Sequence, residues 1–368
     1  MNEKLPNFHT DEWNKIFRNL LADIKSQQCV LLIGPEIVKA NGRPVSHTLR
    51  EDLLRTYAGD IAHYYARDGF FLFRDKVAKE DIQREVKFFY EGHAARQSVE
   101  TAIFKQIAEM PFHLVLSINP DSYLSDICFK HGIKHRFNYF QTNGGAIAEV
   151  EEPSKAVPLF YNLCGHYLYD ESLILDYDDL FRLMKAVFGA PGLPTKLKSS
   201  LESAKTFVCL GFDFDKWYSQ LLLRLLSEKK GSGIKKYAIN TDIADADTTT
   251  FLVHQFGITF LGEDHAFFQE LYLRCKQEGG LRALSSPTSP KAAPVIQQIK
   301  NGQIGQALVQ LDGLITDDDE MKNISLMLSA QFNDLEGKRR HGTIDMRDYF
   351  VRFNQITDSL LDTLDKIA

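Results

Sequence analysis

Cys164 and His166 are the two residues with the clearest capacity for chemistry, and they directly follow the apolar run LFYNL. A thiol beside an imidazole could act as a nucleophile with its base, since the thiolate is the reactive form of cysteine. The pair could also be half of a metal site, but the sequence offers no second pair of ligands. We favour a strand-end turn with a half-buried cysteine and expect no bound metal.

Asn119 and Asp121 follow a second apolar run, in the stretch Ser117-Ile118-Asn119-Pro120-Asp121. An amide both donates and accepts hydrogen bonds, so Asn119 could hold a ligand hydroxyl or a water molecule. The same residues also suit an Asn-Pro turn in which they cap the following helix. The residues alone leave both interpretations open.

Gly34 ends a third apolar run and is followed by Pro35 and Glu36. A strand, a glycine turn and a helix in succession can cradle a phosphate, because backbone N–H groups approach the anion closely. Here the turn has one glycine, the proline lacks an N–H, and a carboxylate repels a pyrophosphate. An ordinary strand-to-loop turn is the interpretation we favour from these residues.

Short apolar runs of this kind predict the elements that position the polar residues. They are rich in Val, Ile, Leu and Phe on both faces, as expected for buried strands of a parallel sheet. Helical patterns separate them, which predicts an α/β fold with a doubly wound, mainly parallel, Rossmann-like sheet and ligands at the carboxyl ends of its strands. The runs lie at 29–34, 113–118, 159–164, 206–211, 236–240 and 258–262. The helical patterns lie at 10–26, 47–58, 80–91, 97–109, 121–131, 177–189, 213–229, 244–256 and 264–278.

Composition narrows the class of protein. The chain has 368 residues, of which 44% are hydrophobic and 25% charged, with a formal net charge of -6. These values are typical of soluble globular proteins, and neither a membrane span nor direct nucleic-acid binding is expected. The five cysteines are scattered without CxxC spacing and the N-terminal residues show no export signal, so we expect reduced thiols and a cytoplasmic location.

The chain is too long for one ordinary core, because single cores stop growing at about 250–300 residues. Residues 1–280 hold the α/β pattern, and residues 281–294 are a Pro- and Ser-rich stretch that we interpret as a linker. Residues 295–368 show only helical periodicity, which predicts a small all-α bundle. The bundle contains no cysteine and a single histidine, so we expect an interaction module rather than an enzyme.

Taken in order, the strand-end stretches resemble the sirtuin-like domain of bacterial NAD-consuming anti-phage defence proteins, such as the Thoeris effector. That family shows Gly-Ala-Gly-x-Ser, Gly-x-Pro, Thr-Thr-Asn-x-Asp, Leu-His-Gly, Asp-Tyr and Gly-x-Ser-x-x-Asp in succession. The corresponding residues of this chain, within about residues 10–280, are Gly34-Pro35-Glu36, Gly42-Arg43-Pro44, Ser117-Ile118-Asn119-Pro120-Asp121, Leu163-Cys164-Gly165, Asp176-Tyr177 and Gly211-Phe212-Asp213-Phe214-Asp215.

This resemblance implies a cleft for NAD or another adenine nucleotide. In the family the Asn positions the nicotinamide ribose and a water, and the His of Leu-His-Gly is the general base. Asn119 and Asp121 match, but Cys164 stands at the position of the His, and loss of a general base lowers a rate about 10²- to 10⁴-fold. His166 is the substitute base we consider. The residues implied to contact the cofactor are Gly34, Glu36, Asn119, Asp121, Gly211, Asp213 and Asp215.

The tail from 295 to 368 resembles the effector-associated domains of bacterial conflict systems, which are small helical adaptors of the death-domain kind. The resemblance rests on the stretches GQIGQALVQL, SLMLSAQFNDLEGKRRHGTI and YFVRFNQITDSLLDTL. Such adaptors pair like with like, so the resemblance implies a protein partner that carries a matching module. We also expect a homo-oligomer.

Two hypotheses follow for the whole chain. In the first, the protein is a scaffold or nucleotide sensor of prokaryotic antiviral defence, with a degenerate sirtuin-like domain and a partner-recruiting tail. In the second, it is an active NAD hydrolase that depletes cellular NAD on infection, using Asn119 with His166. The sequence leaves catalytic activity uncertain, although the cysteine at the position of the histidine favours the first hypothesis.

Overall fold

The computed structural model resolves into two compact units, one built from most of residues 1–283 and the other from residues 284–368. We call them the α/β unit and the helical unit. The structure describes residues 8–95, 99–140, 149–169, 172–189, 192–220, 222, 233–239, 246–261, 265–282, 292–300, 303–315, 319–344 and 346–367.

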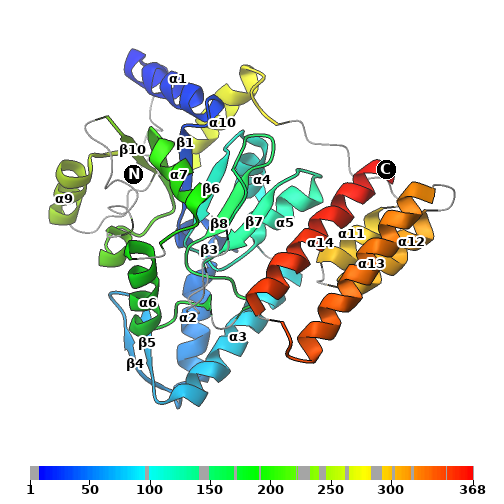
Figure 1. Ribbon diagram of the computed structural model, residues 1–368. Coiled ribbons are helices and arrows are strands. Elements are labelled where there is room, and N and C mark those ends of the chain that lie inside the picture. Colours follow the sequence, from blue (N-terminus) through cyan, green and yellow to red (C-terminus); the bar gives the residue numbers. More distant parts are fainter. Residues whose placement is uncertain are drawn as a thin grey trace. The chain divides into compact units, whose positions relative to one another are not determined.

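The α/β unit is built on a seven-stranded parallel sheet with the strand order β11-β10-β9-β1-β6-β8-β7 (Figure 1). Every residue of its central strands β1 and β9 is buried, which explains their continuous apolar sequences. The α/β prediction is therefore confirmed. The strands are β1 Cys29–Ile33, β6 Leu114–Ser117, β7 Arg136–Tyr139, β8 Leu159–Asn162, β9 Thr206–Leu210, β10 Lys235–Ile239 and β11 Ile258–Phe260.

Strand β7 was not predicted from the sequence. It lies at the edge of the sheet beside β8, and three of its four residues, RFNY, are only half-buried. An edge strand needs no continuous apolar run, so its sequence carried no strand pattern. Two small antiparallel pairs were also missed. They are β2 Lys39–Ala40 with β3 Arg43–Pro44, and β4 Ile61–Tyr65 with β5 Phe70–Phe73.

Helices cover both faces of the sheet. On one face, side chains of α6, α7 and α9 share a core cluster with residues of β1, β6, β8 and β9. On the other face, α1 packs against β1 and α10 against β10, and Phe17 of α1 stacks on Phe267 of α10 at 4.7 Å. The helices are α1 Asp11–Lys25, α2 Val45–Thr56, α3 Lys76–Ala95, α4 Ala102–Glu109, α5 Tyr123–Lys130, α6 Tyr177–Phe188, α7 Thr195–Ser203, α9 Ala246–Phe256 and α10 His265–Gln277.

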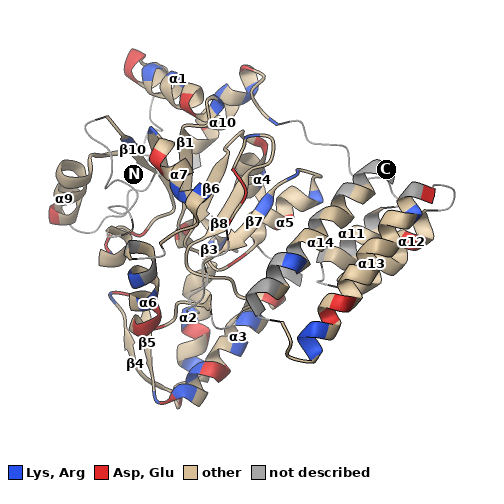
Figure 2. Cartoon of the chain, in the orientation of Figure 1, with Lys and Arg blue, Asp and Glu red and all other residues tan. Residues whose placement is uncertain are grey.

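Most of these helices lie where periodicity predicted them, but α7 was missed and two predictions cannot be followed along their whole length. Of the helix expected at 213–229, residues 217–220 and 222 are helical, whereas 221 and 223–229 lie outside the described residues. Residues 244 and 245 of the helix expected at 244–256 lie outside them as well. Helix α3 shows positive and negative side chains interspersed along its length, with Lys76 beside Glu80 and Arg84 beside Asp81 (Figure 2).

The helical unit contains α11 Ala293–Lys300, α12 Ile304–Leu314, α13 Asp319–Arg340 and α14 Met346–Ile367. Its buried side chains recur at helical spacing, so each helix turns an apolar stripe toward the core. Most of the expected linker, residues 283–291, lies outside the described residues. Among the helices that the structure describes, none is long and apolar enough to cross a bilayer. The core includes Val295, Ile304, Ala307, Leu308, Leu311, Leu328, Leu335, Ile356, Leu360 and Leu364.

Candidate functional site

The carboxyl ends of β9, β1, β6 and β8 lie side by side at one edge of the sheet. Ile33 at the end of β1 pairs with Ser117 of β6 and with Leu210 of β9, and Ser117 pairs in turn with Asn162 of β8. The predicted site segments follow these strands directly. Parallel topology therefore brings the four segments together, as ligand sites of α/β proteins require.

The turns after β1 and β9 are in direct backbone contact. Gly34 donates its N–H to the carbonyl of Leu210 at 2.9 Å, and Glu36 donates to that of Gly211 at 3.1 Å. A Cβ atom on Gly34 would lie 2.1 Å from the Gly211 carbonyl oxygen, and Gly211 has a φ of 68°. Both glycines are therefore needed for this close approach.

This contact determines whether the β1 turn has backbone N–H groups available to bind a phosphate. The N–H groups of Gly34 and Glu36 are already used, and Pro35 has none. The helix that follows is a single 3-10 turn, Pro35–Ile37, and the Glu36 carboxylate lies 3.1 Å from Nε2 of His47. As arranged, the turn does not fit the pyrophosphate of NAD.

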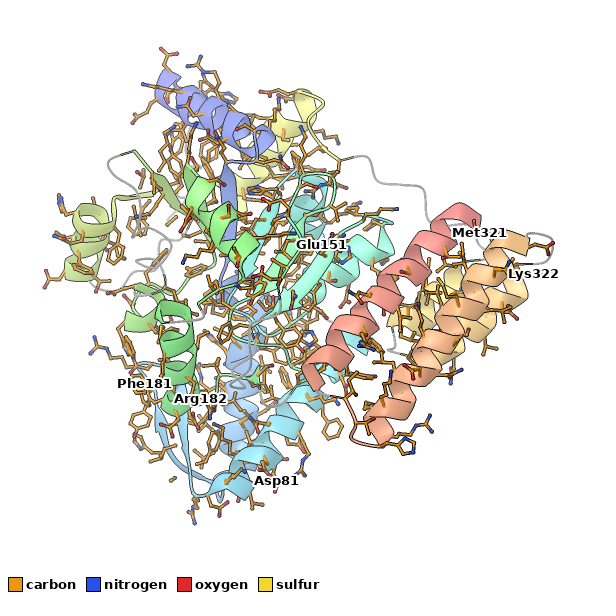
Figure 3. All side chains as sticks on the ribbon, viewed as in Figure 1. Asp81, Glu151, Phe181, Arg182, Met321 and Lys322 are labelled. Atoms are coloured by element: carbon orange, nitrogen blue, oxygen red, sulfur yellow. The ribbon has the colours of Figure 1, made fainter. Side chains whose placement is uncertain are left out.

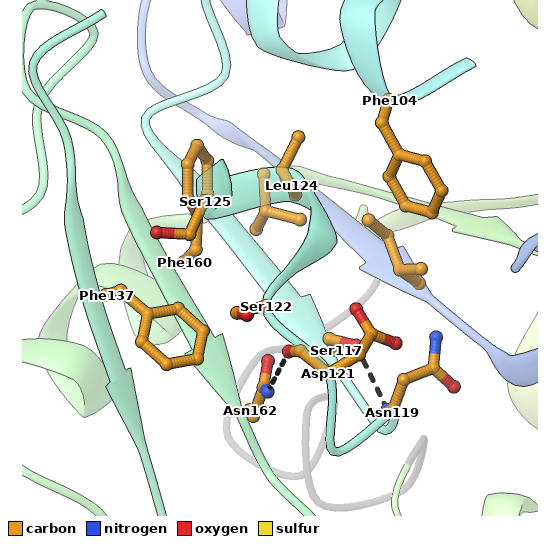
Figure 4. A pocket seen from close by; sticks show the side chains of 12 residues that line it. Phe104, Ser117, Asn119, Asp121, Ser122, Leu124, Ser125, Phe137, Phe160 and Asn162 are labelled. Carbon is orange, nitrogen blue, oxygen red and sulfur yellow. Dashed lines mark hydrogen bonds between the residues drawn. The ribbon is translucent and has the colours of Figure 1, made fainter. Parts of the chain in front are cut away.

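Asn119 and Asp121 form a buried polar turn after β6. The Asn119 amide donates from Nδ2 to the carbonyl of Gly34 at 3.0 Å, and its backbone N–H donates to Oγ of Ser117 at 3.0 Å. Asn162 of β8 donates from Nδ2 to the carbonyl of Asp121 at 2.7 Å (Figure 4). The turn thus links β1, β6 and β8, and the sequence signal for Asn162, a polar residue inside an apolar run, was overlooked.

The Asp121 side chain is a second unusual feature of this turn. Its Oδ1 accepts the Tyr123 N–H at 3.1 Å, whereas its Oδ2 has no partner among the described residues. Burial raises the pKa of this carboxyl group to about 7, so it is largely protonated below neutral pH. A small cavity of about 20 Å³ adjoins it, with room for about one water molecule. Polar side chains that line the cavity include Ser117, Asn119, Asp121, Ser122, Ser125 and Asn162 (Figure 4).

Cys164 packs, half-buried, against the apolar core together with Ile118 and Ile174. Burial raises the pKa of its thiol to about 12, so the thiol stays protonated at neutral pH. A protonated thiol is neither a nucleophile nor a general base. The position therefore contributes packing in this structure.

His166 lies in different surroundings from Cys164. Gly165 between them has a φ of 83°, so the segment is not extended, and an extended segment is what would direct both side chains the same way. The imidazole is 3% exposed; its Nδ1 accepts the Leu168 N–H at 3.3 Å, and its Nε2 has no partner in the described part of the chain. Burial lowers its pKa to about 3. Aromatic rings surround it, those of Phe137, Tyr139, Tyr167 and Tyr169.

The acidic residues after β9 have structural partners in part. Oδ1 of Asp213 accepts the Asp215 N–H at 3.2 Å, and its Oδ2 lies 3.5 Å from Nζ of Lys216. Oδ1 of Asp215 is buried without a hydrogen-bond partner among the described residues. Of the Asp176-Tyr177 pair, Asp176 caps α6 and pairs with Lys79 at 2.6 Å. Asp213 and Asp176 therefore stabilise a turn and a helix start.

No group of three His, Cys, Asp or Glu side chains is placed to hold a metal ion in the part of the chain that the structure describes. The cysteines, all free, are spread through the α/β unit. The sheet edge offers amides, hydroxyls, carboxyl groups, an imidazole, an ammonium group and aromatic rings as groups that could contact a ligand.

Comparison with known proteins identifies the helical unit. Residues 291–368 match the family described as effector-associated domain 11. Such domains are typical of defence and signalling systems, and the resemblance predicted for the tail is confirmed. No curated protein matches the chain. The sirtuin-like resemblance of the α/β unit stays a prediction.

Proposed function

We propose that this protein is an adaptor of a prokaryotic antiviral defence system. In this proposal the α/β unit is a sirtuin-like scaffold without hydrolytic activity, and the effector-associated domain recruits a protein that carries a matching domain. One observation supports the proposed lack of catalysis: Cys164, at the position of the expected general base, is a thiol packed against the apolar core, and burial raises its pKa to about 12.

The substitute base considered from the sequence supports the same conclusion. His166 is enclosed by aromatic rings, and its imidazole is a weak base because burial lowers its pKa to about 3. Activation of a water on a ribose requires a base within hydrogen-bond reach of it, either directly or through one water. Both side chains are packed among apolar or aromatic groups, which works against such a contact.

Exposed apolar side chains support recruitment by the helical unit. Val309 of α12 is 74% exposed, and Leu326 and Met327 of α13 are 62% and 52% exposed. The first turn of α13 holds Met321 and Lys322, which are both half-buried (Figure 3). Apolar side chains that stay in water in the free protein become favourable contacts when a partner covers them. A second copy of this chain is one such partner, which agrees with the expected homo-oligomer.

The test of the catalytic half is incubation of the purified full chain with NAD while nicotinamide release is followed, alone and with candidate partners. We expect no turnover, and a gain of activity in Cys164→His. Turnover by the unmodified protein that disappears in Asn119→Ala would instead establish an NAD hydrolase. For recruitment, Leu326→Glu should weaken self-association or partner binding, whereas Gln331→Glu, an exposed polar position on the same helix, should not.

A further inference from the structure

The hairpin formed by β4 and β5 places one aromatic side chain at the carboxyl edge of the sheet. Phe70, the first residue of β5, is 5% exposed and packs with Leu180 and Met184 of α6. Ile118, which directly follows β6, packs against the same cluster and also against the main core. The Phe70 ring therefore lies where the topology of an α/β sheet places a ligand.

The surroundings of Phe70 are those of a site for a planar ring. Its ring centroid lies 5.1 Å from that of Tyr177 and 5.2 Å from that of Tyr218, and Trp217 packs against the same cluster. These separations are typical of favourable aromatic pairs. Tyr177 is itself flanked by Tyr65 at 5.0 Å and by Phe181, which projects from α6 into solvent (Figure 3).

A few polar contacts hold the hairpin in this position. The Tyr177 hydroxyl donates to Oδ2 of Asp68 at the hairpin tip, and the Phe71 N–H donates to the carbonyl of Leu175 at 3.0 Å. The other oxygen of Asp68, Oδ1, is buried without a partner among the described residues. A two-stranded hairpin is marginal by itself, so these contacts and the Phe70 ring keep it closed.

We infer that Phe70 fills a binding site for a planar heteroaromatic ring, such as the base of a nucleoside, and that the β4–β5 hairpin leaves when the ligand enters. Ligand entry would free Asp68 and expose Lys216 and Asp213 beside the tip, where hydroxyl groups of a ribose could bond. The inference rests on the proposed function, since it names the ligand that a scaffold of this kind would sense. It requires neither hydrolysis nor a pyrophosphate cradle.

Adenosine binding to the full-length chain, measured by calorimetry, tests the inference with two variants and a matched control. Tyr177→Phe removes the hydrogen bond to Asp68 but keeps the aromatic ring, and Phe70→Ala removes the phenyl ring that fills the proposed site. Each should increase the affinity for adenosine about tenfold or more, because apparent affinity rises with the open fraction. Leu72→Ala, on the same strand but 47% exposed, should leave it unchanged. The affinity for NAD is measured in parallel, and the substitutions should increase it by no more than they increase the affinity for adenosine.

Hydrogen exchange in the unmodified protein gives a second readout. Saturating adenosine should accelerate exchange of the Phe71 amide, which is bonded to Leu175 in the closed state. Unchanged affinity in a folded Tyr177→Phe variant, together with unchanged exchange at Phe71, would overturn the inference. This outcome would leave the proposed function intact, since NAD turnover and partner binding are measured without any change in the hairpin.

Discussion

The side-chain amide of Asn119 donates to the carbonyl oxygen of Gly34 at 3.0 Å, and this bond joins the end of β6 to the end of β1. Both groups are removed from water, with Asn119 only 4% exposed. A buried carbonyl without a donor costs about 1–3 kcal/mol. The bond thus fixes the geometry of the sheet edge whether or not a ligand ever binds there.

Asn119→Ala should therefore lower the free energy of unfolding by about 1–3 kcal/mol, because the Gly34 carbonyl loses its donor. Urea titration followed by circular dichroism measures this loss. Asn119→Asp, which keeps the size but replaces the donor with an acceptor, should be at least as destabilising. A neutral effect of both substitutions would mean that the Asn119–Gly34 bond does not stabilise the sheet edge.

Gly34→Ala should be more damaging than any loss of a single hydrogen bond. The new methyl group would lie 2.1 Å from the carbonyl oxygen of Gly211, and this neighbour is backbone that cannot rotate away. We expect a loss of more than about 3 kcal/mol, or insoluble protein. Gly59→Ala is the control, since a methyl group added at Gly59 would meet no atom within 4 Å. Comparable stability of the two variants would contradict the close packing of the two turns.

The positions of these residues show what the sequence could and could not predict. The strand ends were predictable, because buried parallel strands have continuous apolar runs and their carboxyl ends must share one edge. The aromatic surroundings of His166 depend on Phe137 and Tyr139 of β7, an edge strand with no apolar run. Likewise, no local pattern placed Phe70 against Tyr177, which is far away in sequence. Contacts between residues far apart in sequence determine the surroundings of His166 and the position of Phe70, and no local pattern reports such contacts.

Asp121 should make stability depend on pH. Burial raises the folded-state pKa to about 7, above the unfolded value of about 3.9, so the folded state binds the proton more tightly. The stabilisation is fully present below about pH 4 and decreases as the pH rises through 7. Asp121→Asn should therefore gain stability relative to the unmodified protein as the pH rises from 5 to 8, by about 2–3 kcal/mol over this range.

Chemical denaturation of the two proteins at several pH values checks this prediction, and the difference between their curves isolates Asp121 from the other carboxylates. The decisive feature is the sign of the pH dependence: the stability of Asp121→Asn should increase relative to that of the unmodified protein as the pH rises. A difference that stays constant from pH 5 to 8 would show that the Asp121 carboxyl group is ionised in the folded protein throughout this range.

Arg282 joins the C-terminal end of the α/β unit to other segments of that unit through hydrogen bonds. Its guanidinium donates to the carbonyl oxygens of Ala108 at 2.8 Å, Lys155 at 2.9 Å and Phe112, and burial lowers its pKa to about 10. Arg282→Met keeps much of the volume but leaves these carbonyls without their donor, so we expect a loss of about 2–4 kcal/mol. Arg55→Ala is the control, because Arg55 forms an exposed ion pair with Asp52 that contributes less than about 1 kcal/mol. Thermal unfolding of both variants measures the difference. Equal melting temperatures would show that the hydrogen bonds of Arg282 do not contribute to stability.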